Sequence, residues 1–243
     1  MNSYDKYETV IGLEVHVQLS TASKAFCGDS TEFGASPNTQ VSPISLAHPG
    51  TLPVVNEEQI AKAVKLGIAL GCDINRHSSF DRKNYFYADL PKGYQITQDR
   101  SPICIGGALK IKLGETFKSV HIHHIHMEED AGKSIHDTDG PFSQIDLNRA
   151  GVPLLEVVTE PDLRSAEEVD AFMSGMRQLV RWLDVSDGNM EQGSMRCDVN
   201  VSVRLKGAEA FGTRCEVKNV NSMRYAKRAI AYEVNRQINI LEK

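Results

Sequence analysis

The sequence predicts a mixed α+β fold in which a strand-rich first half precedes a second half with two strong helices around a strand pair. Residues 10–19, VIGLEVHVQL, alternate apolar and polar side chains, which is typical of a half-buried strand. Residues 196–205 and 213–220 show the same alternation with a turn between them, as in an antiparallel hairpin. Apolar residues at helical spacing lie before and after this pair, so we expect helices to flank a sheet.

Three helices are predicted from capping residues and apolar periodicity. The first begins after Asn56, a favourable N-cap, and ends at Gly71. The second begins after Ser165 with Glu168 three residues later, which is a capping box. The third begins near Ser222. The buried stripes expected for the three helices are Ile60, Val64 and Ile68, then Val169, Phe172, Met173, Met176, Leu179, Val180 and Leu183, then Ile230, Val234, Ile238 and Leu241.

Two further segments are interpreted as loops. Residues 26–55 are rich in Gly, Pro, Ser and Asn, which indicates a long structured loop. Residues 80–95, FDRKNYFYADLPKGYQ, are basic and aromatic and are closed by Pro91 and Gly93.

Composition excludes several classes of protein. The 243 residues carry a net charge of −5, which argues against a broad nucleic-acid-coating surface but permits a local basic patch. No apolar run reaches the roughly 18 residues of a membrane span, and the first residues lack the apolar core of a signal peptide. The five cysteines, Cys27, Cys72, Cys104, Cys197 and Cys215, contain no CxxC pair, so we expect reduced thiols in a cytoplasmic protein.

Residues 121–137, HIHHIHMEEDAGKSIHD, are rich in possible metal ligands. On a regular strand His121 and His123 would face one side, and His124 and His126 the other, so they would not converge on one zinc ion. No second cysteine or histidine cluster completes a tetrahedral site. For His121, His123 and His124 we therefore favour a solvated strand face.

The same stretch contains the letters GKS, which end a phosphate-binding P-loop motif. The motif requires a glycine at residue 127, where this sequence has Met127, and no Val-rich strand precedes it. We therefore reject a P-loop here.

Acidic residues suggest a different metal chemistry. Glu128, Glu129 and Asp130 offer the oxygen ligands that Mg²⁺ prefers, although an exposed acidic turn is the simpler interpretation of these three alone. Two other segments place polar ligands on one strand face, namely Glu14 with His16, and Asp198 and Asn200 with Glu216. Their joint occurrence favours a sheet-based metal and nucleotide site.

Long segments of the sequence resemble the GatB/GatE family of tRNA-dependent amidotransferase subunits. They are VIGLEVHVQL, FDRKNYFYADLPKGYQI, HMEEDAGKS, DLNRAGVPLLEVVTEPDLRS, EQGSMRCDVNVSV and EVKNVNSMRY, in family order, and the resemblance covers essentially all 243 residues. It implies one catalytic domain over residues 1–243 with a last helix from about residue 222. The implied fold is an α+β cradle with an antiparallel sheet and flanking helices, similar to glutamine synthetase and guanido kinases. The family's helical and tRNA-binding tail domains are expected to lie beyond this sequence.

The resemblance also implies an activity. Mg-ATP would phosphorylate the side-chain carboxylate of Glu-tRNA(Gln) or Asp-tRNA(Asn), and ammonia would then displace the phosphate to leave the amide. The ammonia would come from an amidase subunit that hydrolyses glutamine, and a small third subunit would clamp the two together. The expected cofactors are therefore ATP and Mg²⁺. Two competing interpretations are a non-catalytic tRNA-binding or assembly module and a histidine-rich metal-binding protein.

Site residues follow from the resemblance by position. The best metal-ligand candidates are Glu14, His16 and Glu129, and the further candidates at the same centre are Glu128, Asp198 and Glu216. Lys83 and Lys92 match positions along the ammonia path and acceptor site, with Tyr85, Tyr87 and Tyr94 as pocket-lining or core residues. Arg149 and Arg196 would neutralise phosphate or form structural ion pairs, and Asn200, Lys218 and Asn219 are candidates for nucleotide binding.

The sequence departs from the family pattern at two places. Many members carry four cysteines that hold zinc, whereas the corresponding residues here are Cys27-Gly28-Asp29 and Ser42-Pro43-Ile44-Ser45. With only one thiol left, we expect no structural zinc. His124 stands where an arginine is common, so the resemblance assigns it no role with phosphate.

Overall fold

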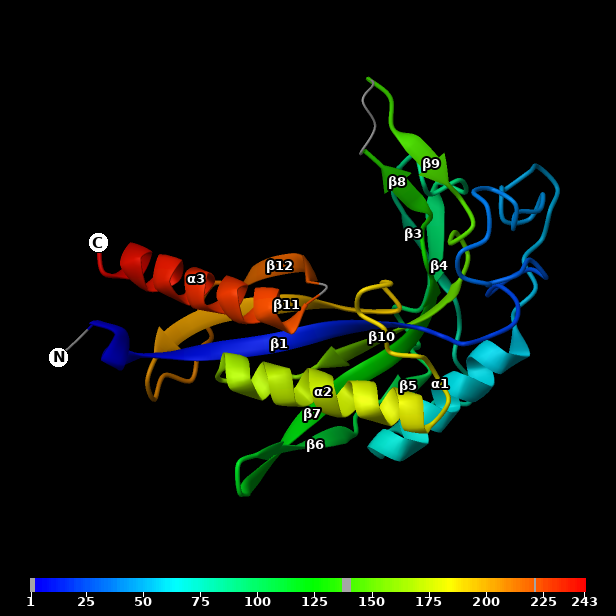
Figure 1. The fold of residues 1–243 in the computed structure, drawn as a ribbon. Helices are drawn as coiled ribbons and strands as arrows, with labels where there is room; N and C mark the ends of the chain where they lie inside the picture. Colours follow the sequence, from blue (N-terminus) through cyan, green and yellow to red (C-terminus); the bar gives the residue numbers. More distant parts are fainter. Residues whose placement is uncertain (1–2, 137–140, 221) are drawn as a thin grey trace.

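The fold is built on one large antiparallel sheet (Figure 1). The structure, a computed structural model, describes residues 3–136, 141–220 and 222–243, without the side chains of Ser3, Tyr4 and Asn219. Within this part of the chain an eight-stranded sheet has the order β12-β11-β1-β10-β7-β5-β2, with β6 paired to β7, and β3-β4 and β8-β9 form two separate hairpins. The strands are β1 Tyr7–Gln18, β2 Asp73–Ile74, β3 Asp81–Asn84, β4 Tyr94–Thr97, β5 Cys104–Ile105, β6 Ala108–Leu113, β7 Thr116–Glu129, β8 Lys133–Ile135, β9 Gln144–Asp146, β10 Pro153–Thr159, β11 Met195–Leu205 and β12 Cys215–Val220.

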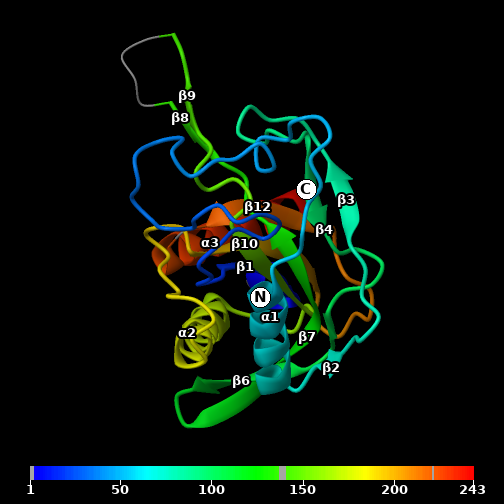
Figure 2. The same ribbon diagram turned by 90° about the vertical axis from the view of Figure 1, so that its right-hand side faces the viewer.

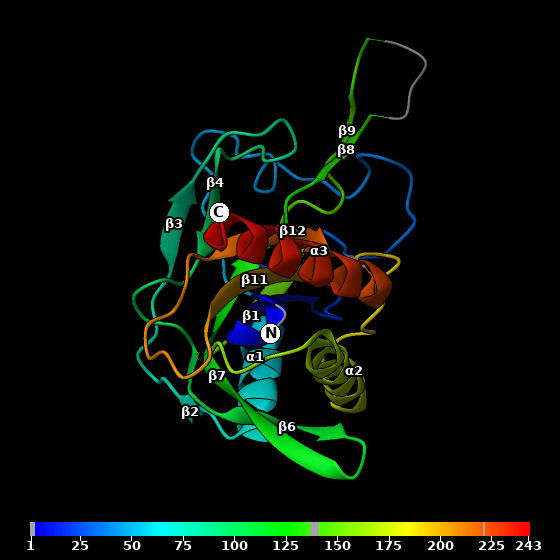
Figure 3. The ribbon, with the colours of Figure 1, turned by 90° about the vertical axis from the view of Figure 1, so that its left-hand side faces the viewer.

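Three helices cover one face of this sheet, as the turned view of Figure 3 also shows. They are α1 Glu57–Leu70, α2 Ala166–Trp182 and α3 Met223–Leu241. Their apolar residues share one core with the odd-numbered residues of β1, including Leu13, Val15 and Val17, which are at most 1% exposed. The predicted antiparallel sheet with flanking helices is therefore confirmed.

The helix boundaries follow the predicted capping chemistry. The Asn56 side chain accepts a hydrogen bond from the backbone N–H of Glu58, and Gly71 ends α1 in the left-handed region with φ 73°. Ser165 accepts from the backbone N–H of Glu168 at the start of α2. Ser222 is the N-cap of α3 but makes no side-chain capping bond. No helix in the described ranges is long and apolar enough to cross a membrane.

The predicted buried stripe of α1 is correct for Ile60 and Val64, which pack against the core, but wrong for Ile68, which is 66% exposed. The helix instead buries Ala63, Leu66 and Leu70. Gly67 explains this choice, since a Cβ there would lie 2.4 Å from Sγ of Cys104 on β5. The glycine lets the helix backbone approach the sheet closely, which a face centred on Ile68 would prevent.

The end of α3 differs from its prediction in a similar way. Leu241 is 56% exposed, whereas Ile230 and Ile238 are buried as expected. Gln237 replaces an apolar contact, because its amide donates to the backbone O of Val201 and accepts from the backbone N–H of Val203. A buried polar side chain with both bonds satisfied fits a core without a large penalty.

Residues 80–95 contain strand structure where a loop was predicted. Residues Asp81–Asn84 pair with Tyr94–Thr97, and only the segment between them is a connection. The β3 strand has no apolar alternation and is largely exposed, so its sequence carries no strand signal. Figure 2 shows this hairpin at the side of the main sheet, with β8 and β9 projecting separately.

The long strand β7 contains a β-bulge at His123. Val158 of β10 pairs with His124, but its neighbour Thr159 pairs with Ile122, so His123 is an extra residue. Before the bulge Val120 and Ile122 enter the core, and after it the core residues are Ile125 and Met127. The strand therefore changes parity, and the regular alternation predicted for residues 120–126 is wrong.

The rejection of a P-loop is confirmed by the backbone. Lys133 and Ser134 lie in strand β8, which pairs with β9. A P-loop lysine and serine would instead open a helix whose N-terminus holds phosphate.

Candidate metal centre

A row of charged side chains crosses the sheet on the face opposite the helices. In register, Arg196 of β11 lies beside His16 of β1, His16 beside Glu156 of β10, and Glu156 beside His126 of β7. Glu156 Oε2 lies 3.2 Å from His16 Nε2 and 3.3 Å from His126 Nε2. Glu128 lies in the next row, 3.7 Å from His16 and 3.6 Å from His126. Two carboxylates and two imidazoles therefore meet on one buried patch.

The charges in this patch stabilise one another. Burial alone would lower the pKa of His126, but hydrogen bonds to Glu128 and Glu156 outweigh it and raise the pKa to about 9. Burial and the same type of carboxylate contact act on His16, and the net effect is a raised pKa. Burial would raise the pKa of Glu156, but bonds to both histidines hold it well below its usual range. The two histidines thus balance the negative charge that the carboxylates place on this face.

A second group of acids lies on the same face, closer to the edge strand β12. One carboxylate oxygen from each of Glu14, Asp198 and Glu216 lies within 4.8 Å of the other two. Asn200 donates from Nδ2 to Glu14 over 2.9 Å, and Lys218 Nζ lies 2.8 Å from Glu216 and 3.7 Å from Asp198. The predicted hairpin does bring Asp198 and Asn200 close to Glu216 and Lys218.

Ligand atoms of His16, Glu128 and Glu156 also lie within 4.8 Å of one another, so the face offers two three-ligand groups. Two buried polar atoms on this face, His16 Nδ1 and Asn200 Oδ1, have no hydrogen-bond partner among the described residues. Buried polar atoms are normally paired, and their exceptions often mark a missing ligand or ion. The donor set is rich in oxygen and therefore fits Mg²⁺.

Glu129 does not join Glu14 and His16, contrary to the predicted grouping. Glu129 is adjacent to Glu128 on the regular part of β7 after the bulge, so its side chain points to the opposite side of the strand. Its carboxylate forms a close ion pair with Lys92 and accepts from the backbone N–H of Ile96 over 3.0 Å. Glu128 therefore occupies the place that the sequence had suggested for Glu129.

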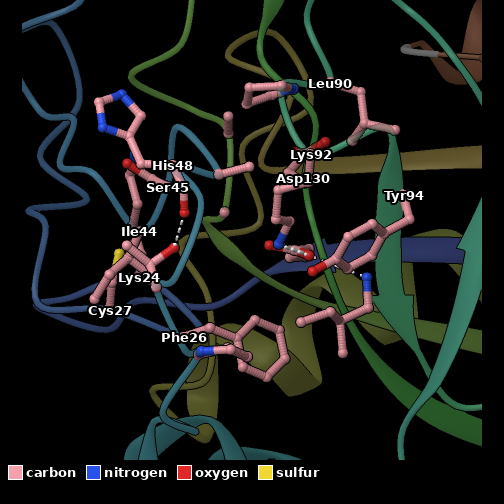
Figure 4. A pocket seen from close by; sticks show the side chains of 18 residues that line it. Lys24, Phe26, Cys27, Ile44, Ser45, His48, Leu90, Lys92, Tyr94 and Asp130 are labelled. Atoms are coloured by element: carbon pink, nitrogen blue, oxygen red, sulfur yellow. Dashed lines mark hydrogen bonds and ion pairs between the residues drawn. The ribbon is translucent and has the colours of Figure 1, made fainter.

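Glu129 and Lys92 instead line a separate pocket of about 230 Å³, together with Lys24, Phe26 and Tyr94 (Figure 4). The Lys92 ammonium lies 5.6 Å from the ring centre of Phe26 and 5.5 Å from that of Tyr94. Burial raises the pKa of Glu129 although Lys92 opposes this effect. The pocket thus combines the aromatic rings of Phe26 and Tyr94 with buried charged groups, among them the Lys92–Glu129 pair.

Arg196 and Arg149 both meet Asp130. Arg196 forms two bonds to the Asp130 carboxylate, of 3.1 and 2.9 Å, and Gln18 donates to it over 2.6 Å. Arg149 Nε lies 3.7 Å from Asp130 and donates to the backbone O of Ala131 over 2.9 Å. Burial alone would raise the pKa of Asp130, but the two guanidinium groups lower it to about 2. In this state both arginines are structural ion-pair partners.

The remaining predicted residues are dispersed. Lys83 is exposed on β3, opposite Gln95, and is not brought to the polar face. Tyr85 donates to Gln95 over 3.3 Å, while Tyr87 is 70% exposed. Of these three tyrosines, Tyr94 lines the Glu129 pocket. Asn219 lies outside the described side chains.

Sequence reasoning missed Glu156 and Lys24, and it named Asp130 only as a possible magnesium ligand, not as the partner of two arginines. Glu156 joins both histidines, and its signal was a lone glutamate inside the apolar strand PLLEVVT. Lys24 is fully buried in the Glu129 pocket and donates to the backbone O of Gln40 over 2.7 Å, although nothing local in the sequence marks it.

Comparison with known proteins gives the same family as the sequence segments. The family model of the GatB/GatE catalytic domain matches residues 9–243. A protein of Salinibacter ruber, named as a subunit of aspartyl/glutamyl-tRNA(Asn/Gln) amidotransferase, is 57% identical over 250 aligned residues, covering 99% of this chain and 49% of the relative. Proteins of the same name from Chlorobium limicola and Chlorobaculum tepidum are 57% and 58% identical over 98% and 97% of this chain, and 50% of each relative.

The fold and site define an α+β protein with a histidine–carboxylate cluster on one face of an antiparallel sheet. The chain belongs to the GatB/GatE catalytic domain family. It spans about half the length of the curated relatives it matches.

Proposed function

We propose that this chain is the catalytic domain of a tRNA-dependent amidotransferase subunit. It would use Mg-ATP to phosphorylate the side-chain carboxylate of Glu-tRNA(Gln) or Asp-tRNA(Asn) and would then convert the acyl phosphate to the amide with ammonia. The observation that carries this proposal is the pair of three-ligand groups on one sheet face. Family membership supports the choice of reaction class.

The chemistry explains why such a face is needed. A carboxylate is a poor electrophile, and transfer of a phosphoryl group turns one of its oxygens into a good leaving group. Positioning and charge neutralisation supply most of the catalysis in phosphoryl transfer. When bound, Mg²⁺ would neutralise phosphate oxygens. His16, Glu128 and Glu156 would hold one ion, and Glu14, Asp198 and Glu216 would hold another.

Neighbouring residues would orient these ligands. Asn200 donates to Glu14 and so fixes one carboxylate of the second group. His126 contacts both Glu128 and Glu156 and would hold them in place without itself being in the three-ligand group. Arg196 is half-buried at the end of the row and adds positive charge near His16.

The Glu129 pocket would serve the amidation step. Its Lys92–Glu129 pair lies on the other side of β7 from Glu128, at the end of the same strand. Apolar and charged side chains both line this pocket, and it would pass neutral ammonia while restricting bulk water. The ammonia would be supplied by an amidase subunit, and a small clamp subunit and mischarged tRNA complete the proposed partners. The likeness to glutamine synthetase and guanido kinases stays a prediction.

Titration calorimetry of ATP with and without Mg²⁺ tests the nucleotide site. Wild-type chain should bind ATP in a Mg²⁺-dependent way, and Glu156→Gln should weaken this binding by about 10–100-fold. Glu115→Gln is the matched control, because Glu115 lies in the exposed β6–β7 turn. Equal binding by wild type and Glu156→Gln, with folding verified by circular dichroism, would contradict the proposed centre.

Reconstitution with partner subunits tests the division of labour. Glu14→Gln should abolish amidation from both glutamine and free ammonium, since phosphorylation fails. Glu129→Gln should leave Mg-ATP binding intact but reduce glutamine-driven amidation. If Glu129→Gln instead lost Mg-ATP binding as fully as Glu14→Gln, the assignment of Glu129 to a separate pocket would be wrong.

A further inference from the structure

The bulge in β7 gives the histidine-rich stretch a geometry that regular alternation would forbid. The extra residue, His123, and the next residue, His124, turn toward one another, and their Nδ1 atoms lie 2.6 Å apart. Their ring centres are 4.9 Å apart with an interplanar angle of 76°. β-Bulges commonly re-aim side chains in this way beside functional sites.

We propose that His123 and His124 form a binding site for an exchangeable first-row transition-metal ion of the Zn²⁺ class. Imidazole nitrogen is a preferred ligand of such ions, with metal–nitrogen distances of about 2.0–2.1 Å. Two nitrogens in a tetrahedral site are then about 3.3 Å apart. The observed 2.6 Å separation reaches this value by small rotations of the two rings, and water completes the coordination.

A neighbouring imidazole orients one member of the pair. His124 Nε2 lies 3.0 Å from Nδ1 of His126, and the two rings stack with centres 5.1 Å apart and an interplanar angle of 23°. This contact holds the His124 ring with its Nδ1 directed at His123. When a metal ion binds at Nδ1, the His124 proton is on Nε2 and is donated to His126 Nδ1, so binding releases the proton that His126 carries there in the metal-free protein. The charges that act on His124 are of both signs, with His126 positive and Glu156 and Asp99 negative.

The pair differs in chemistry from the two carboxylate groups. It offers two nitrogens and no carboxylate in direct contact, so it disfavours Mg²⁺, which prefers oxygen. His123 is exposed, so an ion reaches the site from solvent. The site is also separate from the cysteine zinc site of other family members, for which this sequence retains only Cys27.

His121 provides an internal control. It belongs to the same histidine-rich stretch and is exposed, but its Nδ1 lies 2.7 Å from Asp162 and it pairs away from the other histidines. A general attraction of exposed histidines for metal would involve His121, whereas a built site at the bulge would not.

Titration of the chain with ZnCl₂, with Co²⁺ absorption as a second measurement, tests the proposal. Wild type should bind one equivalent at the pair, and His123→Ala and His124→Ala should each weaken binding at least about tenfold. His121→Ala should bind as wild type does. Circular dichroism verifies folding, and His123→Ala carries little structural risk because the side chain is exposed.

Three results would overturn the proposal. One is the absence of Zn²⁺ binding, or binding that both His123→Ala and His124→Ala leave unchanged. Another is an equal loss in His121→Ala, which would indicate unspecific binding by a histidine-rich surface. The last is loss in Glu156→Gln but not in His123→Ala, which would place the ion at the carboxylate group on the sheet face.

Discussion

The two faces of the central strands differ in this protein, because one packs in the apolar core and the other carries the charged site. On one face Val15, Val157 and Ile125 are fully buried beneath the helices. On the other face the adjacent residues of the same strands, His16, Glu156 and His126, form a connected row of charges. Because side chains alternate along a strand, a single register sets both the core and the site.

This comparison shows how a stable sheet can hold a costly site. Burying charged groups is unfavourable unless they are paired, and the row supplies those pairs from adjacent strands. The apolar face supplies the free energy of folding that keeps the strands in register. Substitutions on the first face should therefore change stability, whereas substitutions on the second should chiefly change charge and ligand binding.

Phe172→Ala should have the largest effect on stability. Phe172 of α2 is fully buried against the apolar face, and its loss should lower the free energy of unfolding by about 3–5 kcal/mol. Urea denaturation followed by circular dichroism measures this change. The control is Trp182→Ala on the same helix, which is 90% exposed and should shift stability by no more than about 0.5 kcal/mol. A similar loss of stability in both variants would contradict the expectation that the apolar face supplies the stability.

The polar face should show two neighbouring histidines with opposite titration. His126 has its pKa raised to about 9, whereas burial, with neighbouring histidines, lowers that of His124 to about 4. In metal-free protein, NMR titration should find His126 charged and His124 neutral at pH 7. Since the folded pKa of His126 is raised, its stabilising contribution is complete below pH 6.5 and is lost as pH rises through 9. Identical titration of the two rings near pH 6.5 would argue against the row.

Asp130→Asn should change how the stability of the protein depends on pH in the acidic range. The pKa of Asp130 is lowered from 3.8 to about 2, so its contribution is present above pH 4 and is lost as pH falls through 2. That shift corresponds to about 2 kcal/mol in wild type. The measurement is unfolding free energy against pH. The unfolding free energy of wild type should fall by this amount between pH 4 and 2, whereas that of the variant should not show this fall. Parallel curves for the two proteins would contradict the ion pairing of Asp130 with the arginines.

Lys218→Ala should have the smallest effect on stability. Its ammonium pairs with Glu216 and Asp198, but the side chain is 62% exposed and such pairs are worth about 0–1 kcal/mol. Thermal or urea unfolding should therefore place the variant within about 0.5 kcal/mol of wild type. A loss of several kcal/mol would mean that the second acid group depends on Lys218 for folding.

Sequence patterns predicted most of the framework correctly. The alternation of residues 10–19 identified the polar face of β1, and the caps at Asn56 and Ser165 located two helices. These signals are local, because alternation and capping are set by residues close in sequence. The buried face of α1, in contrast, depends on a residue distant in sequence, because the close approach of Gly67 to Cys104 determines which face of the helix packs on the sheet.

The grouping of site residues could be predicted only in part. Three of its segments were found, but Glu129 was chosen where the structure places Glu128 with His16. The choice depends on which face of the sheet each residue of β7 takes after the bulge. The sequence contains a sign of the bulge, because the apolar residues from Val120 to Met127 are spaced by two except between Ile122 and Ile125, where the spacing is three. Glu156 was missed because its role depends on pairing with two strands distant in sequence.

The bulge at His123 has a consequence for how this strand can change over evolution or in the laboratory. Replacing His123 by another residue keeps the count of residues, so Ile125, Met127 and Glu128 keep their faces. Deleting it, or inserting a residue beside it, shifts the count by one and would exchange the solvent and core sides of one half of β7. The strand should therefore tolerate substitutions at residue 123 better than insertions or deletions beside it.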